Sequence, residues 1–247
     1  MINRMLITND LRDDGFGAQY QSIIWTILFA EVKGDTFLYS DIVRMDNDTG
    51  DTKKYLEDAI HCMNIKGHYP QVESVGGITM YAPKWPYFYK EIEREMERFH
   101  ATSSFQKIKS LYYMNKTNPY SSSHTHVAVH IRRPRPFDTR TQGVDTPDEY
   151  YVNCMRAVQQ MYTSASKPLL FHIFSTGTER AFEVYKQFPC VFHLDESTFE
   201  TFNKMVYADI LITSPSSFSY VAALLTDGIV IYKPFWHPPR KQWLLLN

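Results

Sequence analysis

The chain has 247 residues, which is enough for one or two domains with a sizeable core. Its 44% hydrophobic and 21% charged residues exclude a disordered, collagen-like or low-complexity chain. The 26 Lys and Arg residues nearly balance the 27 Asp and Glu residues, so no overall positive field draws the protein to nucleic acid or to an anionic membrane. Any phosphate binding is therefore expected to be local.

The three cysteines, Cys62, Cys154 and Cys190, are odd in number and include no CxxC pair. This spacing predicts neither a disulfide framework nor a zinc site, and we expect a reducing, cytoplasmic location. The N-terminus lacks a basic region followed by a long apolar core, and the longest apolar stretch, residues 23–30, is far below the ~20 residues of a membrane span. We therefore expect neither a signal peptide nor a membrane-spanning segment.

The first half of the chain predicts an α/β unit. An apolar run at residues 5–8 predicts a strand, and Gly15-Phe16-Gly17 leads into a segment whose apolar residues recur at helical spacing. Further strands are predicted at 36–42 and 78–82, and helices at 55–63 and 87–99. Asn, Pro and Ser cluster at 115–123, so we place a domain boundary between residues 118 and 119.

The second half alternates more clearly between strands and helices. Strands are predicted at 125–132, 168–175, 191–194, 209–213 and 229–232, and helices at 148–162, 179–188, 197–207 and 216–226. Short apolar strands that alternate with helices are typical of a parallel sheet covered on both faces. Residues 119–247 are therefore predicted to form one Rossmann-like domain.

His130-Ile131-Arg132-Arg133 ends the first of these strands. Because side chains alternate across a strand, His130 and Arg132 share one face while Ile131 and Arg133 share the other. Ligands of open α/β sheets lie outside the carboxyl ends of the strands, so Arg132 is placed to meet an anion such as a phosphate. The alternative is a surface arginine pair with a structural histidine.

Ser214-Pro215-Ser216-Ser217-Phe218 follows the predicted strand 209–213 and precedes apolar residues at helical spacing. Ser214 suits the N-cap and Pro215 the first helical position, which would leave the amides of Ser216 and Ser217 to cradle a phosphate. An ordinary capped helix without a ligand is the alternative.

Two further patterns are weaker. The glycine pair Gly15 and Gly17 lacks the third glycine of a dinucleotide fingerprint but permits close backbone approach to a ligand. Asp46-Asn47-Asp48 is similar to a metal-binding DxD pair, yet it lies in a polar stretch that is better explained as a solvated loop.

Three blocks, in this order, resemble the GDP-fucose-dependent fucosyltransferases, above all the α1,2 family and more distantly the α1,6 and protein O-fucosyltransferases. The first is Gly15-Phe16-Gly17-Ala18-Gln19, which is similar to a Gly-x-Gly-Asn-Gln block. The second is His130-Ile131-Arg132-Arg133, which is similar to a His-x-Arg-Arg motif. The third comprises residues 208–213, Ser216-Ser217-Phe218-Ser219 and the Pro-x-x-Trp-like end at 232–236.

The resemblance implies an α/β fold of the GT-B type with two Rossmann-like domains, the N-terminal one compact. Residues 1–118 would face the acceptor, residues 119–247 would bind the nucleotide sugar, and neither a metal nor another cofactor is expected. Arg132 would hold the diphosphate and support departure of GDP, and the strand end at Ser175-Thr176 would lie near the nucleoside. The residues implied in nucleotide-sugar binding are Gly15, Phe16, Gly17, Gln19, Arg132, Ser175, Thr176, Ser216, Ser217 and Phe218.

The predicted activity is inverting transfer of fucose, or a related deoxyhexose, from a GDP-sugar to a glycan hydroxyl. Arg132 and His130 would be catalytic, with His130 orienting the phosphates or ribose, and the general base would be Asp13, Asp14 or Asp138. The sequence departs from the family at Ala18, after Arg133 and at Ser175-Thr176-Gly177. These departures leave open a different nucleotide sugar or a non-catalytic nucleotide-binding protein of the same fold.

Overall fold

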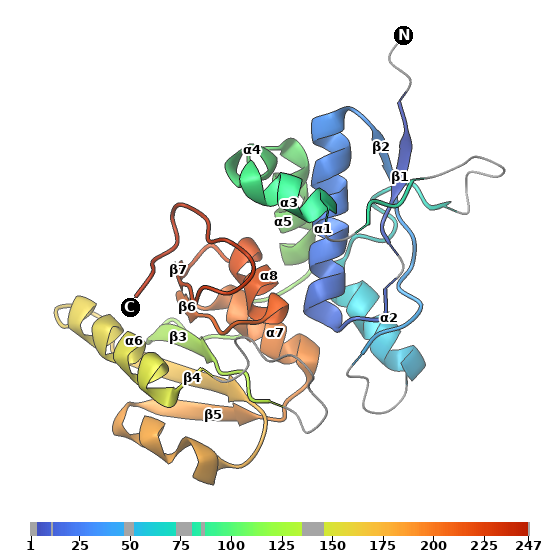
Figure 1. The fold of residues 1–247 in the computed structure, drawn as a ribbon. Coiled ribbons are helices and arrows are strands. Elements are labelled where there is room, and N and C mark those ends of the chain that lie inside the picture. The colour runs from blue at the N-terminus through green and yellow to red at the C-terminus, as the bar shows by residue number, and fades with distance from the viewer. Residues whose placement is uncertain are drawn as a thin grey trace. The chain divides into compact units, whose positions relative to one another are not determined.

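The computed structural model describes residues 4–10, 12–46, 52–72, 81–84, 87–134 and 146–246. The chain folds as two compact units, Met1–Thr117 and Asn118–Asn247. Figure 1 shows helices and strands in both units. Among the described residues, no helix combines the length and the apolar character needed to cross a membrane.

The N-terminal unit begins with a βαβ element. Strands β1 (Leu6–Thr8) and β2 (Thr36–Leu38) pair in parallel and are joined by helix α1 (Phe16–Lys33). Helix α1 is buried from Phe16 to Ala30 except at Ala18, as expected for a helix that is apolar on nearly every side. It ends at Gly34, whose left-handed φ of 75° suits a residue without a Cβ.

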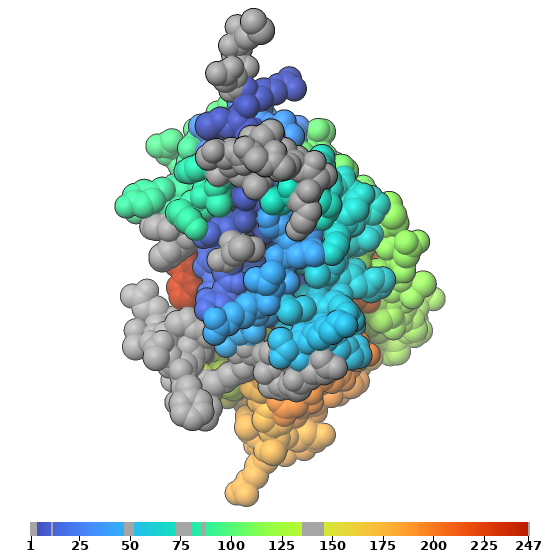
Figure 2. All heavy atoms as spheres, turned by 90° about the vertical axis from the view of Figure 1, so that its right-hand side faces the viewer, coloured from blue at the N-terminus to red at the C-terminus, as the bar shows by residue number. Residues whose placement is uncertain are grey.

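The described residues of this unit include four more α-helices: α2 (Thr52–Met63), α3 (Tyr87–Arg94), α4 (Met96–His100) and α5 (Ser103–Tyr113). Helices α3, α4 and α5 pack against α1. Helix α2 buries only its inner side, and its outer side forms part of the surface in Figure 2.

Three predictions for this unit need correction. The helix predicted at 87–99 is broken at Glu95 into α3 and α4, because Glu95 leaves helical geometry at φ −118° and ψ 30°. Helix α5 was not predicted, and the predicted strand 36–42 ends at Leu38. Of the strand predicted at 78–82, residues 78–80 lie outside the described residues, and Tyr81 bridges to Ile7 of β1.

The C-terminal unit contains a parallel sheet of five strands within its described residues, which confirms the predicted parallel α/β architecture for this half. The strands are β3 (Thr125–His130), β4 (Leu169–Ser175), β5 (Cys190–Leu194), β6 (Ile210–Ile212) and β7 (Ile229–Ile231). Their order is β5-β4-β3-β6-β7. The chain therefore moves outward from β3 to one edge, returns beside β3 at β6, and continues to the other edge.

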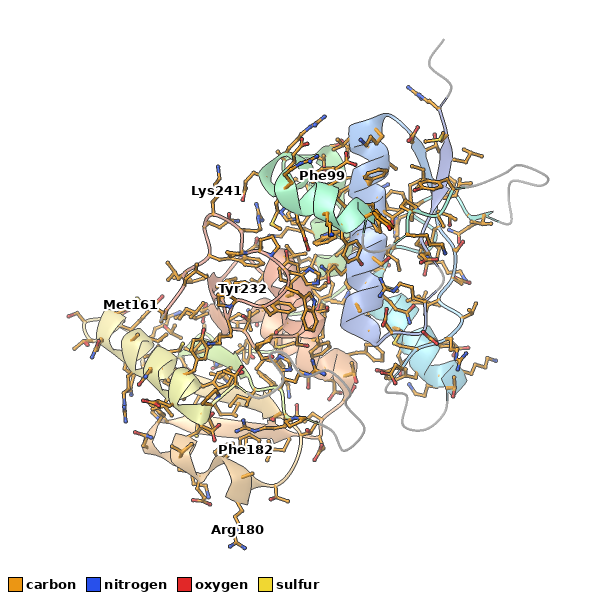
Figure 3. The ribbon with its side chains drawn as sticks, in the orientation of Figure 1. Phe99, Met161, Arg180, Phe182, Tyr232 and Lys241 are labelled. Carbon is orange, nitrogen blue, oxygen red and sulfur yellow. The ribbon has the colours of Figure 1, made fainter. Side chains whose placement is uncertain are left out.

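Helices cover both faces of this sheet. Helix α6 (Asp148–Met161) and the 3₁₀ helix η2 (Glu179–Gln187) share a buried core with Val127, Val129 and Ile131. Helices α7 (Thr198–Tyr207) and α8 (Ser217–Leu225) pack against each other, and α7 contacts β3 (Figure 1). The helix predicted at 179–188 is thus a 3₁₀ helix, kinked at Phe182, whose φ of −122° is not helical. Figure 3 shows Phe182 on the inner side of this segment and Arg180 pointing away from it.

Gly228 precedes β7 at a point where two backbone segments nearly touch. A Cβ at this position would lie 2.4 Å from the carbonyl oxygen of Ala208 and 2.7 Å from that of Asp209. We expect Gly228→Ala to lower the free energy of unfolding of the C-terminal unit by about 1–3 kcal/mol, as overpacking does. Urea unfolding measures the change, with the exposed Ser166→Ala as control; equal stability of the two variants would contradict the close approach.

Candidate functional site

The carboxyl ends of β3 and β6 are joined by a side-chain hydrogen bond. Ser214, two residues beyond β6, places its Oγ 2.7 Å from Nδ1 of His130, the last residue of β3. The two strands are parallel neighbours in the sheet. After β3 the chain continues to β4 on one side, and after β6 it continues to β7 on the other. In open α/β sheets the crevice outside the strand ends at such a point is the usual ligand site.

The state of His130 follows from this contact. Burial, together with the charge of Arg132, lowers the pKa of His130 to about 3, so the ring is neutral near pH 7. Ser214 is fully buried, and in the described part of the chain His130 is the partner of its hydroxyl. Since a buried hydroxyl hydrogen needs an acceptor, Nδ1 accepts it and the ring proton resides on Nε2. His130 therefore has one N–H available as a donor.

The two arginines after His130 have different surroundings, as the predicted alternation requires. Arg133 forms an ion pair with Asp148 of α6 and lies 5.2 Å from the ring centroid of Phe182, on the face covered by α6 and η2. Arg132 is partly buried, and its charge acts on His130. The structure therefore gives Arg133 a structural ion pair and associates Arg132 with the strand-end pair.

The start of α8 differs from the prediction. The N-cap is Ser216, not Ser214, and its hydroxyl accepts a hydrogen bond of 3.2 Å from the amide of Phe218. The amide of Ser216 donates to the carbonyl of Ser214 at 2.8 Å. The expectation that Ser216 offers its amide to a phosphate is therefore wrong, because Ser214 is held by His130 and by Ser219 before the helix begins. Ser217, as the first helical residue, has an amide without an intrahelical acceptor.

Other predicted residues support the strand ends. The hydroxyl of Ser175, at the end of β4, donates to the carbonyl of Ile131 at 2.7 Å and so fixes the residue before Arg132. The ring of Phe218 lies 5.5 Å from that of His130 and 5.4 Å from that of Phe202. Thr176 is exposed in the bend that follows β4. The structure thus brings His130, Phe218 and Ser175 to one region of the C-terminal unit.

The remaining predicted residues lie in the N-terminal unit. Gly15 is the N-cap of α1 and supplies no side-chain cap, Gly17 lies in the first turn, and Phe16 is buried 5.7 Å from the ring of Tyr20. The amide nitrogen of Gln19 donates to the carbonyls of Asp14 and Arg44, each at 2.7 Å. Gln19 therefore ties the segment before α1 to the segment that follows β2.

The acidic candidates divide between described and undescribed positions. Asp14 forms an ion pair with Arg12, and Asp13 is exposed. Asp138, Asn47 and Asp48 lie outside the described residues. Over the described ranges, no three His, Cys, Asp or Glu side chains gather closely enough to hold a metal ion.

Two features of this edge were not predicted from the sequence. Ser214 was interpreted as a helix cap, although its partner is a histidine 84 residues earlier in the chain. Lys233 follows β7, donates its amide to Oγ1 of Thr213 at 2.9 Å, and places its Nζ 4.0 Å from the ring centroid of Tyr150. Because Lys233 directly follows the predicted parallel strand 229–232, the sequence could have indicated it as a second cation at this edge, besides Arg132.

Comparisons with solved structures return glycosyltransferases. The fucosyltransferase NodZ from Bradyrhizobium is 15% identical, with 91% of this chain and 94% of that chain covered and a TM-score of 0.49. The heptosyltransferase WaaC of E. coli is 12% identical, with coverage of 98% and 92% and a TM-score of 0.47. A mutant of Arabidopsis thaliana FUT1 in complex with GDP is 13% identical, with coverage of 94% and 71% and a TM-score of 0.42.

No protein-family model matches the chain, and no curated protein matches its sequence. All three TM-scores lie below 0.5. The parallel α/β architecture of the C-terminal unit is shown by the order and pairing of its own strands.

Removal of the Ser214 hydroxyl tests the strand-end bond. Ser214→Ala leaves Nδ1 of the partly buried His130 without a donor, so we expect the free energy of unfolding to fall by about 1–3 kcal/mol. Urea unfolding near neutral pH measures the loss. The exposed Ser164→Ala should change stability by less than about 0.5 kcal/mol. A Ser214→Ala variant as stable as this control would show that the bond does not form.

The lowered pKa of His130 predicts loss of stability in acid. The unfolded chain binds a proton on this residue near its ordinary pKa of about 6.5, whereas the folded chain does not, so stability is complete above that pH and falls as pH decreases toward 3. Between about pH 7 and about pH 5 this contribution is about 2 kcal/mol.

The variant His130→Asn keeps an acceptor for Ser214 but does not titrate, so its stability should fall less between these pH values. The control His61→Asn, on the exposed side of α2, should keep the full acid dependence. Identical acid dependence in wild type and His130→Asn would refute the assignment of a neutral His130.

Proposed function

We propose that the protein is an inverting glycosyltransferase that transfers fucose, or a related deoxyhexose, from a GDP-sugar to a glycan hydroxyl. The observation that carries the proposal is the hydrogen-bonded pair His130–Ser214 at the strand ends where the sheet order reverses, with Arg132 two residues beyond β3. A guanidinium and a neutral N–H donor at this place suit a diphosphate. The choice of GDP and fucose depends on the resemblance of the sequence blocks to fucosyltransferases.

Transfer of the sugar requires a positive charge and hydrogen-bond donors beside the departing diphosphate. The bond between the anomeric carbon and the diphosphate oxygen breaks while the acceptor oxygen forms a new bond to that carbon from the opposite face. Negative charge accumulates on the departing diphosphate as the sugar becomes oxocarbenium-like, so fixed positive charge is worth most in the transition state. Arg132 supplies that charge, and Nε2 of His130 donates one hydrogen bond without competing as a base.

The start of α8 adds a smaller contribution. A helix N-terminus carries partial positive charge, and the amide of Ser217 lies in the first turn. The hydroxyl of Ser216 caps the helix, so Ser216 acts in this proposal by orienting the turn and not by offering its amide.

The N-terminal unit would take the acceptor side of a GT-B arrangement, with its α1 glycines allowing backbone approach to the donor. The proton released by the acceptor hydroxyl would go to one of Asp13, Asp14 or Asp138. No metal is required in this scheme, because Arg132 and the first turn of α8 would stabilise the negative charge on the departing diphosphate. We extend the proposal to a cytoplasmic protein that acts in glycan synthesis.

Replacement of Arg132 tests the proposal. We expect Arg132→Ala to lower the rate of GDP release from GDP-fucose in the presence of a glycan acceptor by about 10²–10³, as loss of one transition-state donor does. Arg180→Ala is a matched control, because Arg180 is exposed on η2 and points away from the fold (Figure 3). Equal rates for the two variants would contradict the assigned role of Arg132.

The same assay separates the alternatives. Acceptor-stimulated release of GDP supports transfer, whereas tight GDP binding without turnover would identify a non-catalytic binding protein. Turnover of another nucleotide sugar in preference to GDP-fucose would retain the mechanism and replace the donor. Thermal shift over a set of nucleotide sugars at equal concentration ranks their binding, since the stabilisation by a ligand increases with the ratio of its concentration to its Kd.

A further inference from the structure

Lys233 lies two residues beyond β7, at the same sheet edge as Arg132 and Ser214. Its amide donates to Oγ1 of the fully buried Thr213 at 2.9 Å. Thr213 in turn donates its own amide to the carbonyl of Ile231 in β7, also at 2.9 Å. These two bonds fix the backbone of Lys233 beside the residue that precedes Ser214.

The side chain of Lys233 is partly buried and contacts an aromatic ring. Its Nζ lies 4.0 Å from the ring centroid of Tyr150, in the first turn of α6. In the described part of the chain no carboxylate forms an ion pair with Lys233, whereas Arg133 is paired with Asp148. A cation–π contact holds the ammonium group near the strand ends but does not neutralise its charge.

The charge of a diphosphate explains why a second cation would be useful here. Each phosphate of a nucleotide sugar carries a negative charge, and departure of the diphosphate from the sugar adds another. Arg132 supplies a single positive charge, and the charge of Arg133 is already balanced by Asp148. Lys233 has the charge and the N–H donors to bind the second phosphate.

The two cations approach the end of β6 from opposite sides. Ile231 belongs to the core that α6 covers, and side chains alternate along a strand, so Lys233 also projects on the α6 side. Arg132 shares the other face with His130. Neighbouring strands are about 4.8 Å apart, so β3 and β7, which flank β6, are separated by about 10 Å. The long side chains of arginine and lysine can reach a diphosphate between them.

We propose that Lys233 binds the diphosphate of the donor together with Arg132, with one cation on each side of the end of β6. This inference rests on the proposed function, because it names a further binding residue for the same diphosphate. The ring of Tyr150 positions the ammonium group for this contact. An ammonium group has three N–H donors, so Lys233 can donate to a phosphate oxygen while it remains beside the ring.

Lys233→Met tests the proposal, because methionine keeps an unbranched stem and removes the charge. We expect the Kd of the full chain for GDP to rise about 10-fold or more, as it does when a hydrogen bond to a charged group is lost. Lys167→Met is the matched control. Lys167 is exposed and precedes β4, at the opposite edge of the same sheet, so this variant should bind GDP as wild type does. Titration calorimetry with GDP measures the three affinities.

The outcomes separate this inference from the proposed function. Equal GDP affinity of Lys233→Met and Lys167→Met would overturn the role of Lys233. If Arg132→Ala still weakened GDP binding in that case, the diphosphate site at the strand ends would stand without Lys233. Wild-type protein that binds no GDP would refute the proposed function, and this inference with it.

Chemical labelling provides a second measurement, which a purely structural role of Lys233 would not change. Acetic anhydride acetylates accessible lysine amines, and peptide mass spectrometry gives the extent of reaction at each lysine. Saturating GDP should lower the acetylation of Lys233 several-fold and leave that of Lys167 unchanged. Equal acetylation of Lys233 with and without GDP would contradict a contact between its ammonium group and the diphosphate.

Discussion

The hydrogen bond between His130 and Ser214 is the constraint on which the proposed site depends. It joins the carboxyl ends of the two central strands at the point where the chain reverses its direction across the sheet. Ser214 is fully buried and His130 is partly buried, so the bond is costly to break and the geometry of the strand ends is fixed before any ligand arrives. The Ser175 hydroxyl adds a second tie through the carbonyl of Ile131. Arg132 follows this doubly held segment.

Alternation along β3 separates structural from chemical roles. Ile131 and Arg133 face α6 and η2, where Arg133 is satisfied by Asp148 and by the ring of Phe182. His126 and His130 lie on the other face, where Nδ1 of His126 lies 2.9 Å from Nε2 of His172 and His130 belongs to the strand-end pair. One short strand therefore contributes to the core, to a buried polar network and to the proposed phosphate site.

The features that could be predicted from the sequence are those that depend on the local pattern of apolar and polar residues. Apolar runs of strand length and helical spacing located the five parallel strands of the C-terminal unit, and the alternation rule separated Arg132 from Arg133. The start of α8 was misplaced because Ser214 satisfies a histidine distant in the sequence, which no local rule can detect. Helix α5 was not predicted, although the Thr102 cap and the spacing of Phe105, Ile108 and Leu111 are local signals for a helix. The contact between His126 and His172 depends on strand register, which follows only from the folded sheet.

A crystal structure of the protein with GDP tests the central claim most directly. We expect the diphosphate to lie within hydrogen-bonding distance of the Arg132 guanidinium and of Nε2 of His130, close to the first turn of α8. A diphosphate bound elsewhere, or strand ends without nucleotide at saturating GDP, would contradict it.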